Sequence, residues 1–308
     1  MATLRLQLFG RFCATYDGRE LYSFEAGKVQ DLLCYLLLHR KPHARETLAG
    51  LFWGESSTSQ SKKYLRQTLW QLQATVESSL GPLNRRVALV EADWVRLNPA
   101  LDLWLDVAEF ERACSLVNGI SSRELDANSA QSLHEAAQLY TADLLEGCYQ
   151  DWCLYERERL QNLYLTTLDT LISYSEANKE YQRGLSYAAE ILRYDPARER
   201  AHCQMMRLYH AAGDRTAALR QYQRCVVALK NELGVHPSAR TIKLMKIIHS
   251  GESDSASLHR SEELTPESVT HLLPEVLAHL KEVRATLSNI QRQVRRDIRT
   301  VEALTGRR

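Results

Sequence analysis

The side chains whose types and spacing most clearly suggest chemistry lie in the segment 59–73, SQSKKYLRQTLWQLQ. Leu65, Leu69 and Leu72 are spaced by four and three residues, which predicts a helix with these leucines on its buried face. Amide and cationic side chains on the remaining surface can form hydrogen bonds with base edges and phosphates of DNA. The same pattern also fits an ordinary solvated helix surface. The candidate contact residues are Gln60, Lys62, Lys63, Arg66, Gln67, Trp70 and Gln71.

Other reactive or metal-binding side chains do not form a recognisable site. Cys148 and Cys153 are separated by four residues, and His202 adjoins Cys203, whereas zinc sites use four ligands in more closely spaced pairs. We interpret these positions as buried cysteines and surface histidines and expect no metal. The sequence also lacks a GxxxxGK[ST] phosphate loop and a nucleophile-elbow motif. We therefore expect neither a cofactor nor enzymatic activity.

The composition is that of a globular chain with more than one domain. The 308 residues include 44% hydrophobic and 25% charged side chains. Seven scattered cysteines, an odd number, predict no disulfide framework and favour a cytoplasmic location. The N-terminal residues do not resemble a signal peptide, and no stretch is apolar for long enough to predict a membrane span.

Charge is distributed unevenly along the chain. Residues 1–100 contain 13 Lys/Arg and 9 Asp/Glu, whereas residues 101–264 contain 18 and 24. Residues 265–308 contain 8 and 5. The first segment is the sizeable one whose positive charge suits a polyanion.

Residues 1–100 have the order of elements expected of a winged helix-turn-helix domain. Two short strands come first, with a hairpin turn at Asp17-Gly18. Three helices and a hairpin that turns at Ala92-Asp93 follow, with predicted ranges 28–40, 45–52, 58–79 and 86–99. In this arrangement the third helix enters the major groove and the hairpin serves as the wing. The wing and its entry add three candidate phosphate contacts, Arg85, Arg86 and Arg96.

Residues 101–249 predict an all-α domain. Asp106 and Glu109 are spaced as a capping box that would open its first helix. Tyr174 and Tyr187 recur 35 residues later as Tyr209 and Tyr222, close to the period of tetratricopeptide helical hairpins. We interpret these tyrosines as packing between repeats, and a groove for a peptide or small ligand is the alternative. The further helices are predicted at 128–145, 152–177, 180–193, 197–212, 214–233 and 238–249.

The last part of the sequence has the pattern of a coiled coil. Residues 250–264 are polar and rich in serine, which predicts a linker. In residues 265–308 apolar side chains recur in steps of four and three, as in heptads with a hydrophobic seam. We therefore predict a helix that joins copies of the chain into a homo-oligomer through Leu273, Val276, Leu280, Val283, Leu287, Ile290 and Val294.

Taken together, these features resemble the SARP-type family of bacterial transcriptional regulators, over about residues 4–249. In the first domain the similarity is carried by KVQDLLCYLLLHR (28–40), ETLAGLFWGE (46–55) and KKYLRQTLWQLQ (62–73). In the second it is carried by WLDVAEFERA (104–113), DLLEGCYQDWCLYERERL (143–160), ILRYDPARERAHCQMMRLYHAAGDRTAALRQYQRC (191–225) and ELGVHPSART (232–241). The resemblance implies a mainly α fold, in which an α+β OmpR-like winged helix is followed by a tetratricopeptide-like bacterial transcriptional activator domain. It also implies that the winged helix binds double-stranded promoter DNA and that the activator domain packs beside it and contacts RNA polymerase.

The sequence departs from the family pattern in the third predicted helix. Many members continue this helix with arginines, but residues 70–74 read Trp-Gln-Leu-Gln-Ala. Fewer phosphate contacts would change the affinity for DNA and its dependence on salt. The departure leaves open an alternative, in which the chain is a helical-repeat interaction scaffold whose winged helix does not bind DNA. The predicted heptads lie outside the part of the chain that resembles the family.

Overall fold

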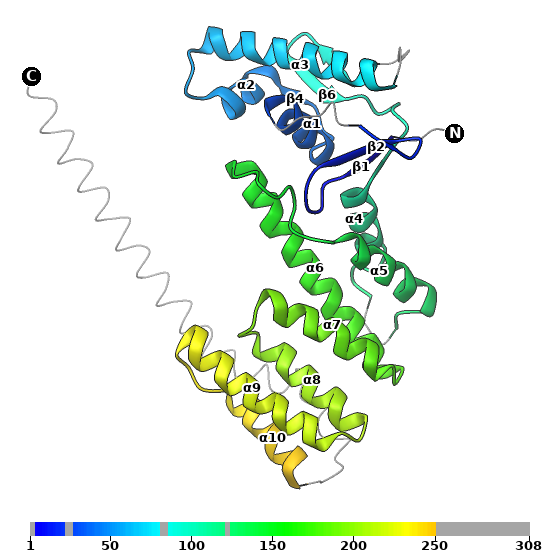
Figure 1. Ribbon diagram of the computed structural model, residues 1–308, viewed down its shortest axis with the longest axis vertical. Coiled ribbons are helices and arrows are strands. Elements are labelled where there is room, and N and C mark those ends of the chain that lie inside the picture. The colour runs from blue at the N-terminus through cyan, green and yellow to red at the C-terminus, as the bar shows by residue number, and fades with distance from the viewer. Residues whose placement is uncertain (1–3, 22–26, 81–85, 121–123, 251–308) are drawn as a thin grey trace, which may run out of the picture. The chain divides into compact units, whose positions relative to one another are not determined.

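The computed structural model describes residues 4–21, 27–80, 86–120 and 124–250, and these residues form a mainly helical protein with a small α+β part at the N-terminal end (Figure 1). The mainly α fold predicted from the sequence is confirmed. No helix of the described residues has both the length and the apolar character needed to span a membrane.

Three helices and a hairpin form the winged helix. Helices α1 (Lys28–Leu38), α2 (Arg45–Trp53) and α3 (Thr58–Leu80) pack together, and strands β5 (Ala88–Glu91) and β6 (Trp94–Leu97) pair antiparallel as the wing. The two-residue strand β4 (His43–Ala44), which the sequence did not predict, joins the other edge of β6. The leucine spacing of α3 has the expected consequence, because Leu65 and Leu72 are buried in the core.

A second sheet, with strand order β3-β2-β1-β7, combines three strands that precede α1 with one that follows the wing. Strands β1 (Leu4–Gln7), β2 (Cys13–Tyr16) and β3 (Arg19–Glu20) form an antiparallel meander. The predicted turn is present: Asp17 and Gly18 have φ angles of 49° and 76°, as a tight hairpin requires. Strand β7 (Leu103–Leu105), which was not predicted, pairs parallel with β1 and thus joins the two ends of the N-terminal part of the chain.

Asp106 connects this sheet to the helical body. It is the first residue of helix α4 (Asp106–Leu116) and is 2% exposed. Its Oδ2 accepts hydrogen bonds from the backbone N–H groups of Leu8 (2.8 Å) and Phe9 (2.9 Å), directly after β1. The predicted capping box is therefore wrong, because the residue at the N-cap is Leu105 and the carboxylate binds another segment instead.

The connection is extended by the loop between the next two helices. Helix α5 (Ala127–Leu139) ends six residues before the predicted position 145, because the following residues pair with the chain after β1. Gly10 N–H donates to Asp143 O (2.9 Å) and Leu145 N–H donates to Leu8 O (2.8 Å). Backbone groups bound to a distant segment in this way cannot continue the helical ladder.

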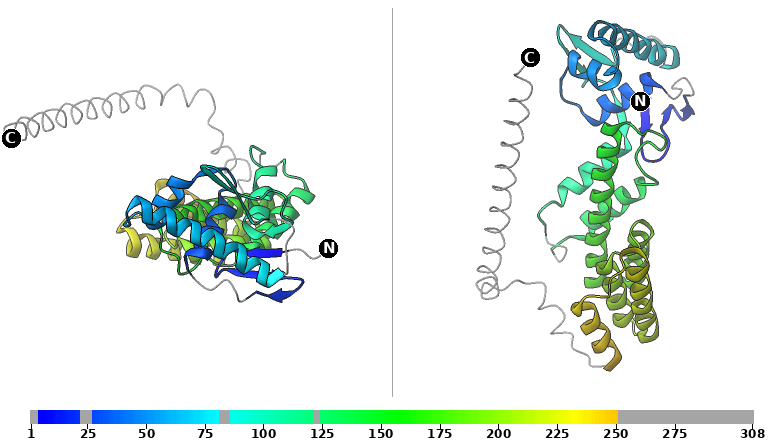
Figure 2. Two further views of the ribbon diagram at one scale, coloured as in Figure 1. Left: turned by 90° about the horizontal axis from the view of Figure 1, so that it is seen from above. Right: turned by 90° about the vertical axis from the view of Figure 1, so that its left-hand side faces the viewer.

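The remaining helices form hairpins that pack in sequence order. They are α6 (Asp151–Ala177), α7 (Tyr181–Tyr194), α8 (Glu199–Ala211), α9 (Arg215–Leu233) and α10 (Ala239–Ser250), and Figure 2 shows them stacked beside one another. Helix α6 also reaches the winged helix at its N-terminal end. There the rings of Trp152 and Tyr35 are 5.4 Å apart, edge to face, and Gln150 Nε2 donates to Asp31 Oδ2.

Two sequence interpretations of the body have different outcomes. Tyr187 is buried and Tyr174 and Tyr209 pack against the core, which agrees with their interpretation as packing residues. His202, interpreted as a surface histidine, is only 3% exposed. Its Nε2 bonds to Pro196 O and its Nδ1 to Gln221 Nε2, and burial lowers the pKa of the ring.

The predicted linker after Ser250 and the predicted heptad helix, with all of its proposed oligomerisation residues, lie outside the described residues.

Candidate nucleic-acid interface

Helix α3 is held in place by its buried face and by a polar contact at its first turn. Ser61, Leu65, Thr68, Leu72 and Val76 are buried at steps of three and four residues. The Ser61 hydroxyl donates to Trp53 O (2.9 Å), the last residue of α2, and so fixes the angle at which α3 leaves the turn. The opposite face of α3 is consequently presented to solvent.

The outward face carries most of the predicted contact residues. Lys63, Arg66, Gln67 and Trp70 are exposed, and their side chains form no hydrogen bond or ion pair with any residue that the structure describes. Lys63, Gln67 and Trp70 follow one another at steps of four and three, so they form a single stripe. We call these three residues the reading stripe. Unpaired donors and acceptors on a rigid helix are available to an incoming ligand without loss of internal contacts.

The other predicted residues of α3 are placed differently. Gln60 is exposed at the N-terminal end, where its Oε1 accepts from the Ser57 hydroxyl (3.2 Å). Gln71 is half-buried at the side of the helix. Lys62 lies beside α2, where its Nζ is 2.6 Å from Glu46 Oε1 and the hydrogen bond lowers the pKa of this carboxyl group. Lys62 and Lys63 are thus neighbours in sequence but differ in their electrostatic surroundings.

The wing contributes a second group of cations. Arg86 is exposed at the entry to β5, whereas Arg96 on β6 is half-buried and pairs with Glu91 at 3.2 Å. Arg85 lies outside the described residues. Sequence analysis missed Arg45, the first residue of α2. Its N–H donates to Asp93 O (2.8 Å) and its guanidinium group reaches Ala92 O (3.5 Å), so it lies beside the tip of the wing.

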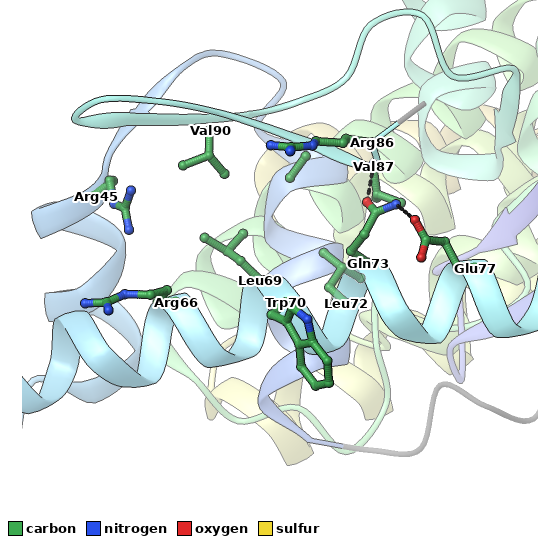
Figure 3. Close-up of a pocket in the computed structure, with 11 residues that line it drawn as sticks. Arg45, Arg66, Leu69, Trp70, Leu72, Gln73, Glu77, Arg86, Val87 and Val90 are labelled. Atoms are coloured by element: carbon green, nitrogen blue, oxygen red, sulfur yellow. Dashed lines mark hydrogen bonds between the residues drawn. The ribbon is translucent and has the colours of Figure 1, made fainter. Parts of the chain in front are cut away.

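An open groove of about 730 Å³ runs between α3 and the wing (Figure 3). The cationic side chains of Arg45, Arg66 and Arg86 lie around it, and Leu69 and Val90 form its apolar floor. Three guanidinium groups on one groove suit the phosphates of a nucleic acid strand, which guanidinium groups bind in a bidentate manner. The signal that could have identified Arg45 is its position at the start of the helix before the recognition helix, next to the wing turn.

Gln73 has a structural role that its position in the recognition helix did not suggest. Its Oε1 accepts from Val87 N–H (2.8 Å) and its Nε2 donates to Glu77 Oε1 (2.6 Å). Both ends of the amide are therefore occupied, as Figure 3 shows, and Gln73 fixes the base of the wing to α3. The Gln73 amide is therefore not available to a phosphate or a base without loss of an internal contact.

The described residues contain no group of three or more His, Cys, Asp or Glu side chains placed to hold a metal ion. The pair Cys148 and Cys153 is present as free thiols at the start of α6, with Cys153 fully buried.

Comparisons with known proteins identify the body of the chain. Residues 105–249 match the family model described as the bacterial transcriptional activator domain. The solved structure of Mycobacterium tuberculosis EmbR in complex with a low-affinity phosphopeptide is similar, with a TM-score of 0.67 at 17% sequence identity. The similarity covers 89% of this chain and 72% of that chain, and at this identity it establishes a shared fold. No curated protein matches the chain in sequence. The resemblance recognised from the sequence is confirmed over the body: residues 105–249 are a bacterial transcriptional activator domain.

Proposed function

We propose that this protein is a transcriptional regulator that binds double-stranded promoter DNA in a sequence-specific manner through α3, with the wing on the adjacent backbone. The observation that carries the proposal is the reading stripe, because an unpaired lysine and an unpaired glutamine lie on one exposed face of a helix supported by a buried core. Lysine bonds to guanine O6 and N7, and glutamine bonds bidentately to adenine N6 and N7.

The cationic groove is independent support for the same proposal. Arg45, Arg66 and Arg86 come from three different elements and line one groove beside the stripe. Phosphate contacts fix the register of a protein on the duplex, and base contacts supply the specificity. In the proposed complex, the groove arginines contact phosphates and the reading stripe contacts bases. The groove arginines would therefore make binding depend on salt.

The test is selection of random duplex DNA by the full chain, followed by gel-shift titration of the selected sequence. Lys63→Ala and Gln67→Ala should each weaken binding by about 10-fold and relax the preference at one base pair. Lys230→Ala is the matched control, because Lys230 is an exposed cation on α9 and should leave both properties unchanged. If the selection yields no preferred sequence, the DNA-binding proposal is wrong.

We further propose that the body activates transcription by contacting RNA polymerase. The support is the match of residues 105–249 to a domain named for transcriptional activation. Transcription in vitro from a promoter that carries the selected sequence should rise when the full chain is added, and Lys63→Ala should shift this rise to about 10-fold higher protein concentration. A fall in transcription would instead identify a repressor.

The alternative is a scaffold in which the winged helix contacts only proteins. The segment 70–74 favours it, because Gln73 is committed to an internal contact and Trp70 exposes an apolar ring. The selection experiment separates the two functions, since a scaffold would enrich no DNA sequence.

A further inference from the structure

Trp70 is the residue of the reading stripe that the proposed function leaves unexplained. It is 71% exposed in the middle of α3, and its indole N–H and ring make no hydrogen bond or ring contact with any described residue. Trp70 is among the residues that line the groove, and in Figure 3 its ring extends away from Val90 and Arg86. A ring of this size gains most of its interaction free energy by burying its apolar faces, so its exposure indicates a missing partner.

The spacing of the reading stripe indicates which base pair Trp70 would face in the proposed complex with DNA. Lys63, Gln67 and Trp70 lie at successive turns of one stripe, and seven residues of α-helix rise roughly 10 Å. Base pairs are stacked about 3.4 Å apart, so the stripe spans about three base pairs when the helix lies in the major groove. Trp70 would therefore face the base pair at one end of the triplet, beside the position that Gln67 reads.

The groups that base pairs expose in the major groove limit what Trp70 could contact there. The indole has one N–H donor and no acceptor, so it cannot make the bidentate bonds that arginine or glutamine makes with a purine. A single donor meets an acceptor on most base pairs and therefore discriminates poorly. The C5-methyl group of thymine is the apolar group that the major groove presents, and an aromatic face can bury it.

We propose that Trp70 is a specificity-determining residue that contacts the C5-methyl group of a thymine in the target sequence. This inference rests on the proposed DNA binding of α3. It gives the exposed apolar ring of the reading stripe a direct role in the selection of one base. Ala74, one turn further, is half-buried and small, and so leaves room for the ring against the duplex.

The test removes one methyl group at a time from the DNA. Each thymine of the selected duplex is replaced singly by deoxyuridine, which deletes the C5-methyl group and leaves the hydrogen-bonding edges intact. At one thymine of the selected sequence, loss of the methyl group should reduce the affinity of the unmodified chain about fourfold, the worth of one buried methyl group. Trp70→Ala should bind the thymine duplex about 10-fold more weakly than the unmodified chain and should no longer distinguish thymine from deoxyuridine at that position.

Three further variants make the result specific to the proposed contact. Trp70→Phe keeps an aromatic face and should retain part of the discrimination. Gln67→Ala weakens binding but should keep the full loss on removal of the methyl group. Tyr155→Ala is the matched control, because Tyr155 is 73% exposed on α6 and should change neither property. Because Trp70 is exposed and unpaired, its replacement leaves the core of the winged helix unchanged.

Three results would overturn the inference, and they are distinguishable. If the chain selects a DNA sequence but no deoxyuridine position separates the unmodified chain from Trp70→Ala, the methyl contact is wrong and the proposed function stands. If no sequence is selected, both fail together. A Trp70→Ala variant that binds every duplex normally but changes the sedimentation mass would assign the ring to contacts between copies of the chain.

Discussion

Lys62 and Lys63 of α3 are adjacent in sequence but differ in their availability to bind DNA, because their neighbours differ. Lys63 points from the outward face and has no partner among the described residues, whereas Lys62 forms an ion pair with Glu46 across the helix-turn-helix. A carboxylate this close to a DNA surface repels phosphates and competes for the lysine at the same time. In the proposed complex with DNA, Glu46 would therefore weaken binding, and its removal should have a measurable effect.

Glu46→Gln is expected to raise the affinity for the selected DNA about three- to 10-fold at low salt. The change removes one negative charge and frees Lys62 for a phosphate, so the slope of log affinity against log salt should become steeper by about 0.9. Gel-shift titrations between 50 and roughly 200 mM salt would measure both quantities.

The control for this change is Glu109→Gln, which breaks an exposed ion pair of similar length with Arg112 on α4 (2.7 Å). It should leave both the affinity and the salt slope unchanged. An unchanged slope for Glu46→Gln would mean that Lys62 and Glu46 do not face the DNA backbone. Neither change should alter stability much, because exposed ion pairs contribute little.

At the scale of elements, hydrophobic periodicity predicted the helices well because each buries its own repeating face. The ranges expected for α1, α2 and α3 agree with the structure to within two residues. The wing was also predicted, since its two strands are adjacent and joined by a tight turn. Strands β4 and β7 were missed because they have two and three residues and pair with strands far away in the sequence.

The same argument explains the errors in individual side chains. Asp106 has a local spacing that fits a capping box, but its partners, the N–H groups of Leu8 and Phe9, come from another element. Gln73 likewise bonds to Val87 N–H, which lies outside α3. His202 is polar by type and buried by position, with both ring nitrogens satisfied. Long-range hydrogen bonds of this kind have no periodic signal in a single sequence. The exposed members of the candidate site were easier to predict, since an amphipathic pattern alone identifies them.

Asp106→Ala is predicted to lower the free energy of unfolding by about 3 kcal/mol, because it leaves the N–H groups of Leu8 and Phe9 buried without acceptors. Urea denaturation of the full chain, followed by circular dichroism, would measure the change.

Asp126→Ala provides the comparison for Asp106. Asp126 is a true N-cap, whose side chain accepts from Ser129 N–H (3.0 Å) at the start of α5. Its loss should cost only about 1 kcal/mol. Equal effects of the two substitutions would show that Asp106 contributes no more than an ordinary cap and that the link to β1 is unimportant for stability.

At the scale of the whole molecule, the uneven distribution of charge is consistent with separate partners. The winged helix is in the segment with excess Lys/Arg, and the activator domain is in the segment with 18 Lys/Arg and 24 Asp/Glu. In the proposed complex, the acidic body would be repelled by the phosphates, and the basic winged helix would face the duplex.

The heptads of residues 265–308 support a proposal of self-association, which would let two winged helices bind repeated half-sites with higher avidity. Sedimentation equilibrium should show an oligomer for the full chain and a monomer for a chain ending at Ser261. Leu280→Lys together with Leu287→Lys should have the same effect as the truncation, because both positions lie in the predicted seam.

The matched control is His279→Lys, which adds charge at a position beside the seam. This variant should retain the mass of the full chain. An identical mass for the truncated and full chains would refute the proposal that the heptads hold copies together.

The parallel pairing of β7 with β1 has a consequence for how such regulators can diversify. Strand β7 and Asp106 follow the wing in sequence, yet they complete the sheet that begins at Leu4 and bind the segment that follows it. An exchange of gene segments that joined this winged helix to a foreign body just after the wing would discard that strand and leave β1 with an open edge. We therefore expect a stable exchange to cross over beyond Asp106, so that the winged helix is inherited together with the first turn of α4.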